Sequence, residues 1–164
     1  MITLRDSIEI KATPDKIYNW IMNMDKHFTE WHPNHKKFEK VTGGMDKGDI
    51  VYFEECVSGV WYKVKCKITR IEKSKSGWEA ELKSLRGTGK ITFMAEAKED
   101  GCLFTHIESF GSKAPIVGKI VDFLFLKVLP RIDPRVRFDL IQRDMEEDGK
   151  RLKEILEEDA HNER

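Results

Sequence analysis

Residues 37–112 read as one strand after another, and a single long helix follows to cover them. Apolar and polar residues alternate through Val60–Ile68 and again through Ile91–Ala97, which is the period of half-buried strands. Turn signals separate the strands at Gly43-Gly44, Ser58-Gly59, Ser76-Gly77, Gly87 and Asp100-Gly101. Helical periodicity then runs from Pro134 to about Glu158. Only a strongly bent antiparallel sheet can bury its apolar face on one helix, so the pattern predicts an α+β helix-grip fold, with a curved antiparallel sheet wrapped around a long C-terminal helix.

The N-terminal segment adds a strand and a helix. Apolar residues alternate through Ile2–Ile10, and Thr13-Pro14-Asp15 then provides an N-cap, a first-turn proline and an early acid, which together begin a helix. Its apolar stripe consists of Ile17, Trp20, Ile21 and Met24. A later apolar stretch, Ile116–Leu129, contains charged residues and is shorter than the roughly 20 residues that span a membrane. We interpret it as a buried or lid-like helix and expect no stable membrane insertion.

Composition narrows the class of partner. The 164 residues suit one domain over 1–164, and 29 basic residues balance 29 acidic ones. Interspersed charges with no net excess argue against a nucleic-acid partner, which usually demands a basic surface. Three cysteines without CxxC spacing, and an N-terminus unlike a signal peptide, predict a reducing, cytoplasmic compartment. We therefore expect a small-molecule partner, and the sequence leaves the oligomeric state open.

The opening segment resembles the start of the SRPBCC superfamily, whose members are START-like, birch-pollen-allergen-like and polyketide-cyclase-like proteins. The segment reads Ile8-Glu9-Ile10-Lys11-Ala12-Thr13-Pro14-Asp15-Lys16-Ile17-Tyr18. The resemblance extends over nearly the whole chain, because the order of the predicted elements also agrees. It implies a hydrophobic ligand cavity between sheet and helix. It implies no single reaction, because this fold serves carriers, sensors, cyclases and hydrolases.

Two carboxylates interrupt the apolar face of the predicted last helix. Asp148 falls near the middle of that face and Asp144 near its edge, at about 100° per residue. The face consists of Leu140, Ile141, Met145, Leu152, Ile155 and Leu156. Residues four apart project side by side, and burying two carboxylates together is costly without a cation or a shared proton. The alternative is a helix that overhangs the sheet, so that both acids meet water or arginine side chains.

A third carboxylate lies in the predicted strand Gly48–Val57. Glu55 shares a face with apolar residues and is predicted to point into the cavity, with Glu54 on the solvent side. His32 and His35 precede this strand in a loop, where histidines are commonly solvent-exposed, and Pro33 excludes a helical pair because it favours an extended His32. One of these imidazoles, together with Glu55, Asp144 and Asp148, would suit a divalent metal ion with an open water position.

A narrower resemblance concerns three short segments. Trp31-His32-Pro33-Asn34-His35, Tyr52-Phe53-Glu54-Glu55 and Glu147–Leu152 resemble the branch related to diacetylphloroglucinol hydrolase. That resemblance implies metal ligands at His35, Glu55, Asp144 and Asp148. Asp144 stands where that family has histidine, and Asp148 where it has glutamate, so zinc, manganese, iron(II) or no metal are all open. Without a metal we expect no other cofactor.

His106 is a second candidate for proton transfer, beside His32. It shares a strand face with Glu108 and with Cys102, Phe104 and Phe110. If that face is the inner one, His106 is a general base or a group that orients the ligand. The alternative, which we favour, is that His106 and Glu108 are ordinary surface residues.

Several functions remain open at this level. We expect binding of a small, largely apolar ligand (a lipid, polyketide or aromatic compound) in the cavity. The chemistry implied by the narrower resemblance is metal-dependent hydrolysis of a carbon–carbon bond in a ketone or acylated phenol. The alternatives are a non-catalytic carrier or sensor, a polyketide cyclase or dehydratase that uses one acid–base pair, and an interaction partner of the chaperone-regulator kind.

Overall fold

The computed structural model describes residues 2–57, 59–111, 120, 123–128, 131 and 138–162. Seven antiparallel strands form one sheet in the order β1-β7-β6-β5-β4-β3-β2. The strands are β1 (Ile2–Ile10), β2 (His35–Lys40), β3 (Ile50–Val57), β4 (Val60–Ser74), β5 (Gly77–Ser84), β6 (Gly89–Lys98) and β7 (Gly101–Phe110). The helices are α1 (Pro14–Met22), α2 (Met24–Trp31), a π-helical turn η1 (Leu124–Val128) and α5 (Phe138–Asn162). The predicted α+β helix-grip fold is confirmed.

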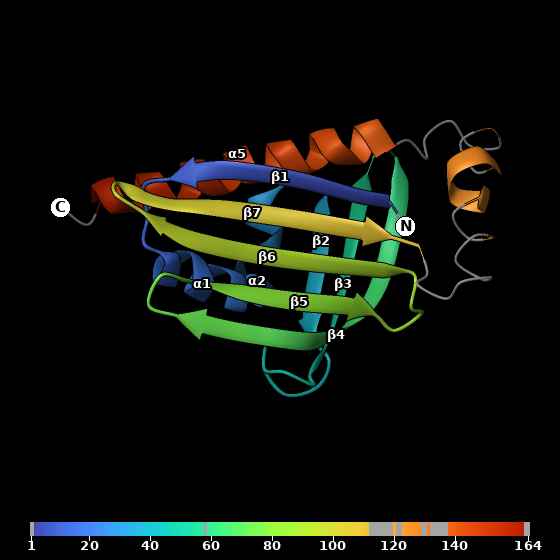
Figure 1. Ribbon diagram of the computed structural model, residues 1–164, viewed down its shortest axis with the longest axis horizontal. Coiled ribbons are helices and arrows are strands. Elements are labelled where there is room, and N and C mark those ends of the chain that lie inside the picture. Colours follow the sequence, from blue (N-terminus) through green and yellow to red (C-terminus); the bar gives the residue numbers. More distant parts are fainter. Residues whose placement is uncertain are drawn as a thin grey trace.

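The bend in the sheet comes from β4. Its first half pairs with β3 over Val60–Lys67, and its second half pairs with β5 over Cys66–Ser74. The register shifts between Ile68 and Arg70, and such a bulge bends a strand and increases its twist. β2 and β3 consequently run crosswise to the strands from β5 to β1 (Figure 1). The curvature leaves a concave face that one helix can cover.

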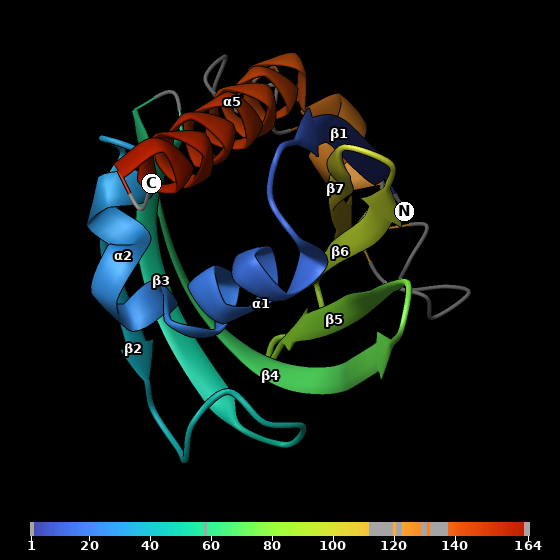
Figure 2. The ribbon, with the colours of Figure 1, turned by 90° about the vertical axis from the view of Figure 1, so that its left-hand side faces the viewer.

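Helix α5 covers the open side of the curved sheet, while α1 and α2 close one end (Figure 2). It also protects the edge strand β1: the side-chain amide of Gln142 donates to the Arg5 carbonyl at 3.1 Å, and the Glu157 carboxylate accepts from the Lys11 N–H at 2.8 Å. Gly149 permits close packing, because a Cβ there would lie 2.7 Å from Asp6 Oδ2. These contacts hold the polar residues of α5 against the sheet.

The core follows the predicted apolar faces. Thr13 caps α1 by accepting from the Lys16 N–H, and the stripe of α1 and α2 is buried at Ile17, Trp20, Ile21 and Met24. Met145, Leu152 and Leu156 bury the face of α5. Cys66 and Cys102 are free and buried, and burial raises their thiol pKa values to about 12 and about 11. They act as small core residues.

Two sequence expectations concern membranes and the lid. None of the described helices is long and apolar enough to cross a membrane. The stretch expected to form a lid-like helix, Ile116–Leu129, lies largely outside the described residues, which here comprise only 120 and 123–128. The cytoplasmic location stays a prediction.

Candidate functional site

A small cavity lies between the sheet and α5, and its lining changes from apolar to acidic. Its volume is about 50 Å³, which is room for a few water molecules, whereas ligand sites typically measure about 300–1,000 Å³. The apolar part includes the rings of Phe28, Trp31, Phe38, Phe53 and Phe93. Its polar lining consists of His35, Glu55, His106, Glu108, Asp144 and Asp148. All four predicted metal ligands and one of the two predicted catalytic residues therefore lie at one cavity.

His35 begins β2 and is held rigidly. Its ring stacks on Phe28 at 4.2 Å between centroids, and its Nδ1 lies 3.1 Å from the Phe28 carbonyl. A carbonyl can only accept, so Nδ1 carries the proton and donates it, which leaves the lone pair of neutral His35 on Nε2. Nε2 lies 3.7 Å from Glu55 Oε2 and 3.6 Å from Asp148 Oδ2. The alternative of a solvent-exposed loop histidine is wrong, because His35 is buried.

Asp148 and Asp144 come from successive turns of α5. Asp148 is only 6% exposed, and its Oδ1 is buried without a hydrogen-bond partner in the described part of the chain. Trp31 holds this turn of the helix in place, because its indole N–H donates to the Asp148 carbonyl at 2.9 Å. The overhanging-helix alternative is therefore wrong for Asp148. Asp144 is half-buried, and burial followed by the charge of Asp148 raises its pKa.

Glu55 lies at the centre of the carboxylate group. Burial is the main cause that raises its pKa well above 4.5, and the charges of Glu108, Asp148 and Asp144 raise it further. Glu54, the preceding residue, faces outward and accepts a hydrogen bond from the Tyr52 hydroxyl at 2.5 Å. The predicted inward and outward assignment of Glu55 and Glu54 agrees with the structure. Four carboxylates without a described lysine or arginine among them make the site strongly electronegative.

His32 lies beside the cavity and differs from His35 in its tautomer. The Asn34 N–H donates to His32 Nδ1 at 3.2 Å, so neutral His32 carries its proton on Nε2. That nitrogen lies 3.5 Å from the exposed carboxylate of Glu147. The potential ligand atoms of His32, His35 and Asp148 lie within 4.8 Å of one another. Proximity alone would make His32 a metal ligand, but in this tautomer its Nε2 carries a hydrogen and has no lone pair for a metal. The predicted part of His32 in proton transfer stays a prediction.

His106 faces the cavity, and the favoured surface alternative for it is wrong. It is 6% exposed, packs on Phe93 with 4.7 Å between ring centroids, and lies between Phe104 and Glu108 on the inner face of β7. Both ring nitrogens are buried without a hydrogen bond among the described residues, although Nε2 lies 3.3 Å from Glu108 Oε1. Sequence reasoning missed Glu108 as a cavity residue. The available signal was the spacing in β7: Glu108 lies two residues after His106, so both side chains point to the same face of the sheet.

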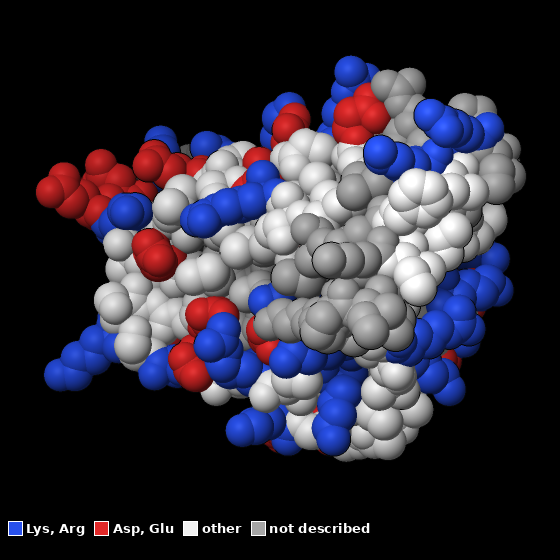
Figure 3. Space-filling view, turned by 45° about the vertical axis from the view of Figure 1, so that its right-hand side comes forward, with Lys and Arg blue, Asp and Glu red and all other residues white. Residues whose placement is uncertain are grey.

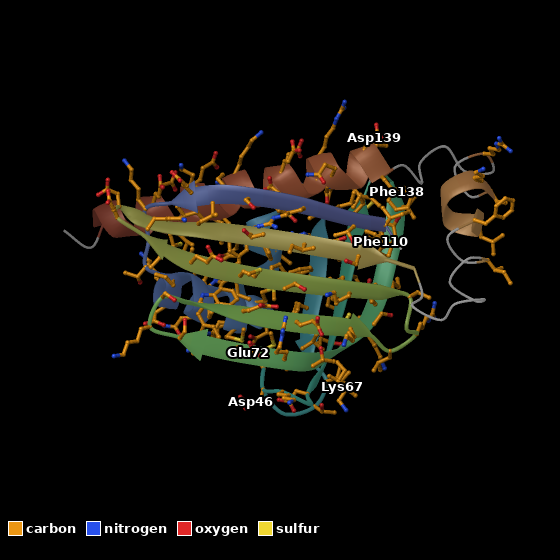
Figure 4. The ribbon with its side chains drawn as sticks, viewed as in Figure 1. Asp46, Lys67, Glu72, Phe110, Phe138 and Asp139 are labelled. Carbon is orange, nitrogen blue, oxygen red and sulfur yellow. The ribbon has the colours of Figure 1, made fainter. Side chains whose placement is uncertain are left out.

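Apolar residues close the cavity at the end where α5 begins. Phe110 at the end of β7 and Phe138 at the start of α5 face each other with 5.8 Å between ring centroids (Figure 4). Ile141 and Met145 continue this apolar wall and also line the cavity. The acidic group is thus flanked by hydrocarbon, which strengthens its mutual repulsion.

Comparisons with known proteins identify the family. Residues 1–157 match the model of the family described as polyketide cyclase / dehydrase and lipid transport. No curated protein sequence matches the chain. Solved structures share the fold: a START superfamily protein from Mycobacterium smegmatis has a TM-score of 0.66 at 12% identity, with 95% of this chain and 97% of that chain covered. These comparisons leave the narrower resemblance to the hydrolase branch a prediction.

Two further structures agree with this assignment of the fold. Major latex-like protein 151 from Panax ginseng has a TM-score of 0.65 at 13% identity, with 94% and 97% of the two chains covered. The polyketide cyclase-like protein Cgl2372 from Corynebacterium glutamicum has a TM-score of 0.61 at 17% identity, with 98% and 94% covered. The solved structures show the shared fold, and the family model covers nearly the whole chain. The chain therefore belongs to the polyketide cyclase / dehydrase and lipid-transport family, which supports the binding of a hydrophobic small molecule.

Proposed function

We propose that this protein binds a small, largely apolar ketone or acylated phenol in the cavity beneath α5 and hydrolyses its carbon–carbon bond with the help of a divalent cation. The observation that carries the proposal is the convergence of a fixed imidazole and four carboxylates in a cavity that is otherwise lined by aromatic and aliphatic side chains. Apolar rings suit the body of such a ligand, and the acidic group suits a cation that faces its oxygen.

The residues present fit a divalent cation. Asp148 Oδ1 is a buried acceptor without a hydrogen-bond partner among the described residues, and His35 presents the lone pair of Nε2 toward Glu55 and Asp148. The separations of 3.6 and 3.7 Å between Nε2 and these oxygens are close to the roughly 3.4 Å between ligand atoms of a tetrahedral ion with bonds near 2.1 Å. One nitrogen with several oxygens favours manganese, iron(II) or zinc. Asp144 would add a further carboxylate.

Hydrolysis adds water across the bond between the acyl carbon and the ring. The acyl carbon gains hydroxide and leaves as a carboxylic acid, and the ring carbon must gain a proton. A bound cation would supply polarisation of the ketone oxygen or a more acidic water molecule. A histidine that takes the proton of the attacking water becomes an imidazolium, and that form can give the proton to the ring carbon. His106, buried and without a hydrogen bond in the described structure, would fill this role, with His32 as the alternative.

Ligand entry requires the cavity to enlarge. A volume of about 50 Å³ holds a few waters, so an aromatic ligand must displace side chains or part of α5. The partly exposed side chains mark where the cavity meets solvent: Glu55 is 22% and Glu108 16% exposed. We therefore expect ligand binding to change the packing of α5 against β3 and β7.

The metal is tested first, by elemental mass spectrometry on untagged protein purified without chelator. Wild type and Glu158→Gln, an exposed position on the same helix, should retain near-stoichiometric metal, whereas Asp148→Asn should lose it. The metal-loaded protein should then release acetate from an acetylated phloroglucinol, and chelator should abolish the release. Wild type that neither contains nor takes up zinc, manganese or iron would remove the metal site from the proposal.

A second candidate, a cyclase or dehydratase without metal, rests on the raised pKa of Glu55. Burial and the neighbouring charges favour the protonated form of this carboxyl, and His106 is a second buried titratable group on the same cavity. One protonated carboxyl and one neutral imidazole form an acid–base pair that can move protons in a polyketide. Turnover of such a substrate that survives chelation, and that Glu55→Gln abolishes, would favour this candidate over hydrolysis.

A further inference from the structure

The outer surface of the first half of β4 is basic and partly apolar. Its inward residues line the core, while Trp61, Lys63, Lys65 and Lys67 alternate with them and are exposed. The neighbouring strand β5 and its turn add exposed Lys83 and Leu85. We call this surface the basic face, defined by Trp61, Lys63, Lys65, Lys67, Lys83 and Leu85. Figure 4 shows Lys67 on the outside of the sheet, on the opposite side of the molecule from α5.

Like charges lie directly opposite each other on this face. Lys67 is the cross-strand partner of Lys83, and Lys83 is the partner of Lys90 on β6. Like charges directly opposite each other destabilise a sheet. Glu81 offsets part of the repulsion, at 3.0 Å from the Lys83 Nζ and 3.1 Å from the Lys90 Nζ. Lys65 and Lys67, in contrast, form no ion pair within the described ranges.

The charge of the whole chain is zero, so this concentration is local. Figure 3 shows lysine and arginine side chains over much of the visible face, including its lower and right-hand parts, and acidic side chains most densely near the C-terminus of α5. Lysines that lie opposite one another on β4 and β5 despite their mutual repulsion point to an anionic partner.

Two large apolar side chains lie among the lysines. Trp61 and Leu85 are each 52% exposed. The Lys36 Nζ lies 5.0 Å from the centroid of the Trp61 ring, and the Leu85 N–H donates to the Lys65 carbonyl at 2.9 Å. Tryptophan and lysine together are typical of surfaces that lie at a membrane interface, where the ring enters the headgroup region and the ammonium groups meet anionic lipids.

We propose that the basic face docks this protein onto the surface of an anionic lipid bilayer. Lysines on a sheet match a plane of negative charge without requiring fixed geometry, whereas paired arginines would be expected for bidentate contacts with phosphates or bases. Each lysine near an anionic bilayer adds appreciably to binding, and exposed Trp61 and Leu85 add apolar contact. The face lies outside the sheet and is separate from the cavity, so docking does not depend on the proposed hydrolysis.

Trp61 provides a built-in reporter of docking. Trp20, Trp31 and Trp78 are buried, whereas Trp61 is exposed. Vesicles of phosphatidylcholine with phosphatidylserine should therefore shift the tryptophan emission to the blue, and brominated lipid should quench it. Vesicles of phosphatidylcholine alone should do neither, and added salt should reverse binding.

Charge reversal tests which surface docks. Lys65→Glu with Lys67→Glu should lower partitioning onto phosphatidylserine vesicles by roughly tenfold or more. The matched control, Lys75→Glu with Lys98→Glu, changes the net charge equally at exposed positions in the turn after β4 and at the end of β6, and it should bind like wild type. Circular dichroism should show that both variants are folded.

Three outcomes would overturn the proposal. Wild type could fail to prefer anionic vesicles, or both charge-reversal variants could lose binding equally. Alternatively, a single-stranded oligonucleotide could bind more tightly than the vesicles and show the same loss in Lys65→Glu with Lys67→Glu. That last result would assign the basic face to nucleic acid in place of lipid.

Discussion

Replacing Glu55 by glutamine should stabilise the metal-free protein at neutral pH. Glu55 lies among Glu108, Asp144 and Asp148, and burial with these charges raises its pKa well above 4.5. The folded state therefore holds a proton that the unfolded chain has already lost. Because the folded state binds more protons, the free energy of unfolding falls as the pH rises from about 4.5 toward the raised pKa. Glutamine has the same shape without the charge, so it removes this loss.

The pH dependence of the free energy of unfolding sets the expected size of the stabilisation by Glu55→Gln. A single group that is protonated in the folded state and ionised in the unfolded state costs about 1.4 kcal/mol per pH unit within its window. For a domain of this size, that difference corresponds to roughly 3–6 °C in Tm for every pH unit. The advantage of Glu55→Gln over wild type should therefore grow from about pH 4.5 upward and level off where wild-type Glu55 ionises.

The assay is thermal unfolding by circular dichroism from pH 4 to 8 in chelator. Glu54→Gln is a matched control with the opposite sign, because the hydrogen bond from Tyr52, together with Lys63, lowers the pKa of Glu54. A carboxyl whose pKa is lowered by folding stabilises the folded state at pH values above its ordinary pKa. Glu54→Gln should therefore lower Tm at neutral pH. Parallel Tm profiles for Glu55→Gln and wild type would refute the electrostatic reasoning. A divalent cation should raise the Tm of wild type more than that of Glu55→Gln.

Two further predictions concern glycines with positive φ and the support of Asp148. Gly101→Ala should destabilise the protein by more than about 2 kcal/mol, because Gly101 has φ +145° and a Cβ would collide with the Ile10 carbonyl. Gly87→Ala should cost only about 1 kcal/mol, because Gly87 has φ +72° with open space around the Cβ. Urea unfolding measures both. Trp31→Phe removes the N–H that donates to the Asp148 carbonyl. It should cost about 1 kcal/mol or more and weaken metal uptake, whereas unchanged metal affinity would show that Trp31 does not position Asp148.

The fold was predictable because its signals are local. Alternation in Val60–Ile68, the capped start at Thr13 and the apolar stripe of α5 each follow from the residues of one element. The chain has many more strands than helices, so the apolar face of the sheet can be buried only if the sheet bends around the one long helix. The bulge between Ile68 and Arg70 carries no such signal, because it depends on β4 pairing with different strands along its length.

The site was predictable only as a set of candidates. Sequence identified Asp144 and Asp148 as carboxylates on an apolar helix face, and Glu55 as an inward strand residue. The sequence could not decide whether His106 faces inward, because both faces of β7 carry polar and apolar residues. A shift of the strand register by one residue would move every side chain to the opposite face. Glu108, which shares the face of His106, was assigned to the surface with it for the same reason. The different tautomers of His32 and His35 come from the Asn34 N–H and the Phe28 carbonyl, which only the folded backbone places.

The amino-acid sequence by itself determined the kinds of element, their order and the odd polar residues on apolar faces, because periodicity and capping act over a few residues. Tertiary structure alone decided that Asp148, near the end of the chain, comes within ion-pair distance of His35 on β2, which also lies within that distance of Glu55 on the neighbouring strand β3. It also decided that lysines from β4 and β5 share one outer surface, because strand register sets which side chains are neighbours. Both depend on distances that no local pattern encodes.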